Sequence, residues 1–328
     1  HPTGEEFLTA LIVGYEVAAR AGVATKLRAG VHPFGAWGVL GAAAVGAKLR
    51  GLNAEQTLEA LNIAASYAIA PSFETAFQGA NVRHTYAGMV NHNGLLAVDF
   101  SQLGFMGERG GAGTTFGKIL GDRFTIAALT DDLGTHYEIM RGYFKPYSGC
   151  RYSHGVIDIC LQLREQLPAA QIERVEVETY GIAATLKNPA PKTALAGRFS
   201  IPFIAASALR LGHATPEAFR EEALRDAATL DLAARTTVRE NPEFTALLPG
   251  VRASKVTLFG QDGKSVSLQA NGSKGDPDQP MSETELREKF NTLTQHALAP
   301  EEAGRLWDIL SDLAELGDAA QIVSLSHA

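Results

Sequence analysis

The stretch YFKPYSGCRYSHGVID, at residues 143–158, gathers one lysine, one arginine, one histidine, one cysteine and three tyrosines. Pro146 and Gly149 break the regular backbone there, and an apolar helical pattern follows. Cations and proton carriers at the start of a helix can hold a small anion and move its protons. The alternative is a solvated loop that leads into an ordinary helix. The residues that favour the first interpretation are Lys145, Tyr147, Arg151 and His154.

Two neighbours in the same stretch have simpler explanations. Ser153 is predicted to cap the helix whose apolar face carries Val156 and Ile157. Cys150 is expected to be a small buried hydrophobic residue and not a nucleophile, because a low-pKa cysteine needs a special environment. The cap explains the serine but leaves the lysine, the arginine and the histidine unexplained.

A second cluster, GVHPFGAWG at residues 30–38, presents a histidine beside a helix. Pro33 fixes its own φ and keeps His32 out of helical geometry, so the imidazole is expected at a loop just before a helix. The N-terminus of a helix favours an anion nearby. The alternative is a histidine that only packs or caps at this loop.

A third cluster, NVRHTYAGMVNHNG at residues 81–94, places Arg83, His84 and Tyr86 just before a helical pattern. A guanidinium group can bind a carboxylate through a planar fork of donors. The alternative is a polar loop with a solvated arginine.

Several familiar site motifs fail in this sequence. GGAGTTFGKI at residues 110–119 resembles a phosphate-binding loop, but Ala112 stands where the first glycine belongs, and Ile119 follows the lysine where Ser or Thr is required. No dinucleotide fingerprint follows a strand pattern. C-x-x-C, a histidine pair at i, i+4, and G-x-S-x-G are all absent. We therefore expect no metal and no other cofactor.

Composition narrows the class of protein. The chain has 328 residues, 45% of them hydrophobic and 20% charged, which suits a globular protein of two domains. The net charge is −7 without a long run of one sign, so no nucleic-acid partner is expected. The apolar run 36–48 is too short to span a bilayer, and the two cysteines suit a reducing compartment. We expect no membrane association and a cytoplasmic location.

The helical part that must position the second and third clusters covers residues 1–141. Thr3 is a suitable N-cap for a first helix with apolar residues at helical spacing, and Asn53 is a suitable cap for a third. A second helix is predicted at about 36–49, where small residues permit close helix approach, and a fourth follows the third cluster. Several Ala-rich helices in succession predict an all-helical bundle domain.

Residues 142–275 predict a smaller α+β domain. VEVETYG at 175–181 alternates like a strand, and KVTLFGQDGKSVSLQA at 255–270 is typical of a hairpin. Helices are expected between them at 199–211 and 216–226. Residues 276–328 predict two amphipathic helices, 283–293 and 300–316, that pack back on the helical domain. The expected fold is therefore mainly α with an α+β second domain.

Taken in order, the three clusters resemble the MmgE/PrpD family. The matching patterns are HP-x-G-x-W-G, V-R-x-x-Y-A-G and K-P-Y-x-x-C-R-x-x-H-x-x-I-D, and the stretches GYEVAARAG at 14–22 and ALAGRFSIPFIAASALRLG at 194–212 are similar as well. The resemblance covers nearly the whole chain. It implies a large helical domain, a smaller α+β domain, a homodimer and no metal.

The resemblance also implies a cofactor-independent lyase of propionate metabolism or a related route. Its shared chemistry handles the proton α to a carboxylate in a small polycarboxylic acid, as in 2-methylcitrate dehydratase. The alternatives are iminodisuccinate epimerase and cis-aconitate decarboxylase. His32, Lys145 and His154 are then the expected catalytic residues. The expected substrate-binding residues are Arg83, His84, Tyr86, Tyr147 and Arg151.

Three positions depart from the family pattern. Members usually begin with a further helical segment that contains an Asp-Asp and a His-Pro-Gly motif, whereas this chain enters at HPTGEEF. Phe203 stands where some members have a tyrosine, and Arg83 stands where many have a lysine. The alternative of another class is therefore a non-catalytic remnant that binds carboxylates or serves dimerisation.

Overall fold

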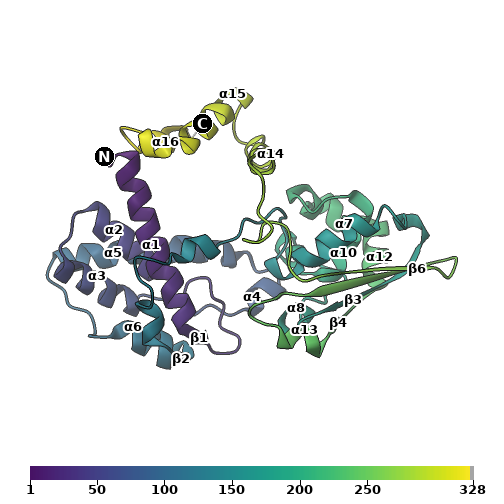
Figure 1. Ribbon diagram of the computed structural model, residues 1–328, viewed down its shortest axis with the longest axis horizontal. Coiled ribbons are helices and arrows are strands. Elements are labelled where there is room, and N and C mark those ends of the chain that lie inside the picture. The colour runs from purple at the N-terminus through teal and green to yellow at the C-terminus, as the bar shows by residue number, and fades with distance from the viewer. Residues whose placement is uncertain (326–328) are drawn as a thin grey trace. The chain divides into compact units, whose positions relative to one another are not determined.

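The computed structural model describes residues 1–325, which form two compact units (Figure 1). Unit 1 comprises residues 1–73, 82–142 and the chain from 282 onward. Unit 2 comprises residues 74–81 and 143–281. The expected fold class is confirmed, because unit 1 is built of helices with one small sheet and unit 2 combines helices with a four-stranded sheet.

Unit 1 is organised around four helices whose packing surfaces are lined with small residues. They are α1 (Gly4–Ala24), α2 (Gly38–Leu49), α3 (Ala54–Ser66) and α5 (Tyr86–Gln102). α2 packs against the other three. A Cβ added to Gly14 of α1 would lie 2.8 Å from the carbonyl oxygen of Gly41 in α2, and one added to Gly94 of α5 would lie 2.6 Å from that of Val39. Glycine at these positions therefore sets the close helix approach that the sequence predicted.

The start of each predicted helix follows its cap. Thr3 and Asn53 each form a capping box, with Glu6 and Gln56 as the reciprocal partners. α2 begins at Gly38, two residues later than expected, because the chain around His32 and Pro33 continues as a loop. The shorter elements of unit 1 are β1 (Thr25–Leu27), β2 (Gly121–Phe124), α6 (Gly111–Thr114), a π-helical turn (Thr115–Ile119) and 3₁₀ turns at Asn81–Thr85, Ile126–Leu129 and Glu138–Arg141.

A buried ion pair on α1 holds the chain that follows β2. Glu16 and Arg20 are 7% and 4% exposed, and Nε of Arg20 donates to Oε1 of Glu16 at 2.6 Å. Arg20 also donates to the carbonyl oxygens of Asp131 (2.7 Å) and His136 (2.9 Å), and the amide of Glu138 donates to Oε2 of Glu16 at 2.7 Å. The pair therefore uses its hydrogen-bonding capacity to fix the segment 131–138 on α1, as a buried pair must to offset its desolvation.

By length and composition alone, α1 is apolar enough to cross a membrane, which the sequence reading overlooked. In unit 1 it packs against α2 and carries the charged pair Glu16 and Arg20 on its buried side. Both features also suit a helix of a globular unit.

The last helices group with unit 1. They are α14 (Glu283–Thr294), α15 (Pro300–Ser311) and α16 (Gln321–Leu325). The amide of Gly4 donates to the carbonyl of Leu316 at 2.7 Å, and that of Ala319 donates to the carbonyl of Pro2 at 2.9 Å. The predicted helix 300–316 is shorter than expected: α15 ends at Ser311, and a 3₁₀ turn at Leu313–Glu315 brings the chain onto the start of α1.

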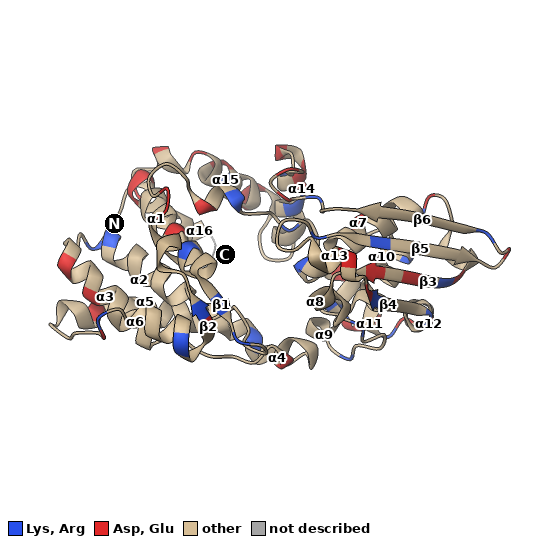
Figure 2. Ribbon diagram, turned by 60° about the horizontal axis from the view of Figure 1, so that its bottom comes forward, with Lys and Arg blue, Asp and Glu red and all other residues tan. Residues whose placement is uncertain are grey.

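Unit 2 contains a mixed sheet in the order β4-β3-β5-β6. β3 (Ile172–Thr179), β5 (Ser254–Gly260) and β6 (Ser265–Ala270) are antiparallel neighbours, whereas β4 (Thr236–Glu240) runs parallel to β3 and was not predicted. Val175, Val177 and Thr179 are all buried, as the alternation of β3 required. The other face is charged. Figure 2 shows acidic and basic residues on neighbouring strands, where Glu178 contacts Arg239 at 3.2 Å and Lys255 at 3.6 Å.

Helices cover the buried face of the sheet. α7 (His154–Leu163) packs against β5, β6 and α10 (Ile201–Leu211), which in turn packs against α12 (Ala227–Ala234). The predicted helix 199–211 starts later, because Ser200 caps α10 through the amide of Phe203 and separates it from α9 (Ala194–Arg198). The predicted helix 216–226 is instead a 3₁₀ turn at Pro216–Phe219 followed by α11 (Glu221–Leu224). The remaining helices of unit 2 are α4 (Glu74–Phe77), α8 (Gly181–Ala184) and α13 (Pro242–Ala246).

Replacing Glu16 with Gln tests the buried pair. We expect the free energy of unfolding to fall by about 3 kcal/mol, because the substitution leaves the charge of Arg20 buried without its counterion. Urea unfolding measures this loss, and hydrogen exchange at the Glu138 amide should show faster opening of that segment. Glu221→Gln is the matched control, because Glu221 forms an i,i+4 pair with Arg225 at an exposed site and should change stability by less than about 1 kcal/mol. Equal losses in the two variants would contradict the structural role of the pair.

Candidate functional site

His32 lies on the loop before α2, as predicted, but its side chain is buried. It is 2% exposed, its amide donates to the carbonyl of Pro71 at 2.8 Å, and its ring stacks on Phe73 with centroids 4.8 Å apart. Pro33 keeps this residue out of α2, so the imidazole enters the unit from a loop. The sequence indicated the loop but not the burial, because the burial depends on Phe73, some forty residues away.

Both ring nitrogens of His32 face hydrogen-bond donors. The amide of Phe34 points at Nδ1 at 3.0 Å, and Nε of Arg83 points at Nε2 at 3.2 Å. A neutral imidazole accepts at one nitrogen only, and an imidazolium accepts at neither. Only one of these two contacts can therefore be a hydrogen bond at a time. The Phe34 contact is a hydrogen bond when Nε2 carries the proton, and the Arg83 contact is one when Nδ1 carries it.

The same surroundings keep His32 unprotonated. Burial and then the charge of Arg83 lower the pKa of His32 from 6.5 to about 4. The imidazole is consequently neutral at pH 7 and can accept a proton. Such a group can serve as a base once something offsets the neighbouring positive charge.

Two of the three candidate residues in the third cluster, Arg83 and Tyr86, lie beside His32. Arg83 lies on the 3₁₀ turn Asn81–Thr85, with its guanidinium 4.6 Å from the ring centre of Phe34. Tyr86 opens α5, is 7% exposed, and has its ring 6.2 Å from that of His32. His84 lies exposed on the same turn. The structure thus brings His32, Arg83 and Tyr86 together in unit 1, and we call these three residues the His32 cluster.

The candidates of the 143–158 stretch lie in unit 2, where His154 is fully buried at the start of α7. Its Nε2 lies 3.3 Å from the carbonyl oxygen of Gly149, and the Tyr147 ring meets its ring edge-on with centroids 5.3 Å apart. Lys145 is exposed and Tyr147 is partly buried. His154, Tyr147 and the Gly149 carbonyl are therefore one packed group.

Arg151 contacts two side chains of unit 2, Asp276 and Tyr143. It is 9% exposed, forms an ion pair with Asp276, and lies with its guanidinium 4.8 Å from the ring centre of Tyr143. Burial raises the pKa of Tyr143, against the charge of Arg151. Part of the positive charge expected for substrate binding is thus already neutralised by Asp276.

The capping role predicted for Ser153 is wrong. Ser153 occupies the N-cap position of α7, but its hydroxyl donates to the carbonyl of Cys150 at 2.7 Å and caps no amide of the helix. The 3₁₀ turn Arg151–Ser153 runs directly into α7 and brings that carbonyl within reach. Cys150 is only partly buried, and its amide donates to the carbonyl of Arg198 at 2.7 Å. Cys160 is buried, which raises the pKa of its thiol.

Two acidic residues that the sequence reading did not select complete this group. Asp158, one turn after His154 on α7, accepts from the Tyr147 hydroxyl at 2.5 Å and from the Lys274 amide at 2.8 Å. Asp276 pairs with Arg151. The i,i+4 spacing of His154 and Asp158 was the available signal for the first. Asp276 lies more than a hundred residues from Arg151 along the chain, so no local sequence pattern indicated it.

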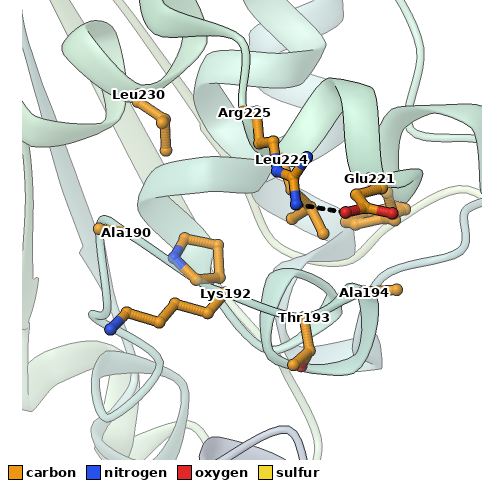
Figure 3. Close-up of a pocket in the computed structure, with 10 residues that line it drawn as sticks. Ala190, Lys192, Thr193, Ala194, Glu221, Leu224, Arg225 and Leu230 are labelled. Carbon is orange, nitrogen blue, oxygen red and sulfur yellow. Dashed lines mark hydrogen bonds and ion pairs between the residues drawn. The ribbon is translucent and has the colours of Figure 1, made fainter.

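A surface cavity of unit 2 contains none of these candidates. It has a volume of about 600 Å³ and is lined by the 190–194 segment, Phe219 and the α11 region (Figure 3). Lys192 lies across from the ion pair of Glu221 and Arg225 in that view. It contains no histidine, cysteine or tyrosine, so it lacks a group that titrates near neutral pH. Among residues 1–325, no three His, Cys, Asp or Glu side chains are arranged to hold a metal ion.

Comparisons with known proteins agree with the order of the clusters. The sequence model for the MmgE/PrpD N-terminal domain matches residues 1–115, and that for the MmgE/PrpD C-terminal domain matches residues 147–315. The cis-aconitate decarboxylase-like protein oryM of Aspergillus oryzae is 26% identical over 352 residues, covering 98% of this chain and 71% of that protein. The cis-aconitate decarboxylases of Mus musculus and Homo sapiens are each 24% identical, covering 98% of this chain and 68% and 69% of their own lengths.

Replacing Arg83 with Met tests its influence on His32. We expect the pKa of His32 to rise above about 4 but to stay below 6.5, because the charge is removed while the burial remains. The titration is followed by NMR of the histidine Cε1–H signals, with His32 assigned by loss of its signal in His32→Asn. Arg50→Met is the control, because Arg50 pairs with Asp99 at the surface and should leave the His32 titration unchanged. A His32 pKa that does not respond to Arg83→Met would overturn the coupling.

The same pKa predicts how stability depends on pH. Folded His32 takes up a proton only near pH 4, whereas the unfolded chain does so near pH 6.5. The unfolded state therefore binds more protons between these values, and His32 makes the protein less stable as the pH is lowered through this window. In urea unfolding at pH 7.5 and pH 5, His32→Asn should lose less stability on acidification than the wild type. An identical loss in both proteins would contradict this sign.

Proposed function

This chain belongs to the MmgE/PrpD family, and from that premise we propose that it is a cofactor-independent lyase acting next to a carboxylate of a small polycarboxylic acid. The observation that carries the proposal is the pairing of a neutral buried histidine with an arginine, His32 with Arg83. Such a pair combines a proton acceptor with a cation that attracts carboxylates.

A carboxylate bound by Arg83 would strengthen His32 as a base in two ways. Its negative charge offsets the positive charge that lowers the pKa of His32. It also competes with His32 for the guanidinium, which faces Nε2 at 3.2 Å, so that in the tautomer with the proton on Nδ1 the lone pair of Nε2 becomes available to a proton. We propose His32 as the residue that moves the proton at the α-carbon: it removes that proton in a dehydration or epimerisation, and it delivers a proton to carbon as CO₂ leaves in a decarboxylation. Arg83 would hold a substrate carboxylate and stabilise the enolate charge that develops.

The residues proposed from unit 2 contribute a second set of groups. Lys145 is proposed as a catalytic cation or acid and His154 as a second proton carrier, with Tyr147 and Arg151 arranging the stretch that carries them. The exposure of Lys145 supports a role in contact with substrate. The ion pair of Arg151 with Asp276 supports a role for Arg151 in placing that stretch.

Among substrates, we propose the cis-aconitate class first. The relatives reported above are named as cis-aconitate decarboxylases, and their identities of 24–26% support a related reaction more strongly than the same substrate. Dehydration of 2-methylcitrate and epimerisation of iminodisuccinate stay predictions from the sequence. The expected homodimer and cytoplasmic location likewise stay predictions, and light scattering of the purified chain tests the first.

The reaction is tested by incubating the purified protein separately with cis-aconitate, 2-methylcitrate and iminodisuccinate. We expect loss of CO₂ from cis-aconitate, with a dicarboxylic acid as the product identified by mass spectrometry. Loss of water from 2-methylcitrate would instead identify a dehydratase, and inversion of iminodisuccinate an epimerase. If no acid is converted while one of them raises the melting temperature, the chain binds carboxylates without catalysis, and the lyase proposal fails.

His32→Asn tests the base. Asparagine retains a polar side chain but can neither accept nor deliver the proton at the α-carbon, so turnover should fall by about 100-fold or more. The matched control is His92→Asn, since His92 is exposed on α5 and should leave turnover unchanged. A His32→Asn protein with wild-type turnover would remove His32 from the mechanism.

A further inference from the structure

Asp158 connects three segments of unit 2. It lies on α7, one turn after His154, and both of its carboxylate oxygens have partners. Oδ1 accepts from the Tyr147 hydroxyl at 2.5 Å, and Oδ2 accepts from the amide of Lys274 at 2.8 Å. The carboxylate therefore ties α7 to the segment 143–149 on one side and to the chain after β6 on the other.

This hydrogen bond decides what Tyr147 can do. Its hydroxyl hydrogen is directed to Asp158, so the phenol oxygen presents acceptor lone pairs to any further partner. Its ring meets the imidazole of His154 at 72°, with centroids 5.3 Å apart. Because the hydroxyl is held, the Tyr147 side chain cannot swing away from His154 about χ1 without breaking the bond to Asp158.

The chain after β6 braces the same stretch. We call residues 271–279 the brace loop. The amide of Phe144 donates to the carbonyl of Gly275 at 3.0 Å, and the amide of Ser273 donates to Oδ2 of Asp276 at 3.0 Å, while Asp276 pairs with Arg151. Gly275 has φ +89°, and a Cβ there would lie 2.0 Å from the carbonyl oxygen of Phe144, so only glycine fits.

The pKa of Asp158 is raised above its ordinary value. Burial raises the pKa of Asp158, and the nearby charge of Asp276 raises it further. The Tyr147 hydroxyl, the Lys274 amide and the charge of Arg151 act in the opposite direction. The carboxylate thus depends on the two residues that it positions, Tyr147 and the brace-loop amide, for its own solvation.

We propose that Asp158 is a positioning residue that holds the Tyr147 hydroxyl and, through the Tyr147 ring, fixes the imidazole of His154. Its contribution to turnover rests on the function proposed above. Its effect on the orientation of His154 does not, because that effect can be measured without substrate.

The first test is a double-mutant cycle read by NMR. Asp158→Asn keeps the size of the side chain but removes its charge and places an amide group opposite the Lys274 amide. We expect it to shift the ring signals of His154, and to shift the Cζ signal of Tyr147 in protein labelled at tyrosine Cζ. In a Tyr147→Phe background, Asp158→Asn should leave the His154 signals where Tyr147→Phe alone put them. His154 signals that respond to Asp158→Asn equally in both backgrounds would show that Asp158 does not act through Tyr147.

The second test is kinetic. Asp158→Asn should lower kcat on the order of 100-fold with a smaller change in KM, since misplacement of a catalytic group by about 1 Å costs this much. It should lower kcat no further in the Tyr147→Phe background. Additive losses, or a lower melting temperature with unchanged kcat, would overturn the proposal.

Two controls separate the possible failures. Asp262→Asn is the same substitution at an exposed position of unit 2 and should change neither the His154 signals nor kcat. If Asp158→Asn does not fold, Tyr147→Phe keeps the ring and should by itself shift the His154 signals, and their constancy would contradict the inference. A wild type without turnover would refute the proposed function and the kinetic role of Asp158, while the NMR cycle would still decide its positioning role.

Discussion

The contact between Arg83 and His32 is the interaction on which the proposed chemistry depends. A buried imidazole with a donor at each nitrogen cannot keep both contacts as hydrogen bonds, and a guanidinium beside it disfavours protonation. The unliganded state therefore holds a base that is unprotonated but weakened. A carboxylate bound by Arg83 would draw the guanidinium from Nε2 and offset its charge. Binding of an acid would therefore strengthen His32 as a base.

The fold supplies the rigidity that such a pair requires. In unit 1, glycines at the crossings of α2 with α1 and α5 allow the backbones to touch, and the pair of Glu16 and Arg20 fastens a long irregular segment to α1. In unit 2, Asp158 ties Tyr147 to α7 and to the brace loop, and Asp276 of that loop pairs with Arg151. Both units thus stabilise irregular backbone with buried or partly buried charged groups that are themselves hydrogen-bonded.

Features that depend on neighbouring residues in the chain were predictable from the sequence. The capping boxes at Thr3 and Asn53, the alternation of β3 and the hairpin of β5 and β6 all follow from spacing within a few residues. The strand β4 was missed because its five residues carry only a weak pattern and gain their stability from pairing with β3. The predicted cap at Ser153 was wrong because the nearby carbonyl of Cys150 takes the hydrogen bond of its hydroxyl.

For the candidate site, the residue types were predictable but their surroundings were not. The sequence selected His32 and Arg83 as separate loop residues, and only the fold places Nε of one against Nε2 of the other. Asp158 and Asp276 escaped selection because an acidic residue near a helix or in a polar loop has many explanations until its partner is known. His84 lies exposed on the same turn as Arg83, and its role in substrate binding stays a prediction.

The most direct measurement is proton NMR in D₂O of the wild type and of His32→Asn, each incubated with cis-aconitate, 2-methylcitrate, citrate and iminodisuccinate separately. We predict that the wild type introduces deuterium at a carbon next to a carboxylate of one of these acids, and that His32→Asn does so far more slowly. The contradicting result is a wild type that leaves the protons of all four acids unexchanged, or a His32→Asn protein that exchanges them at the wild-type rate.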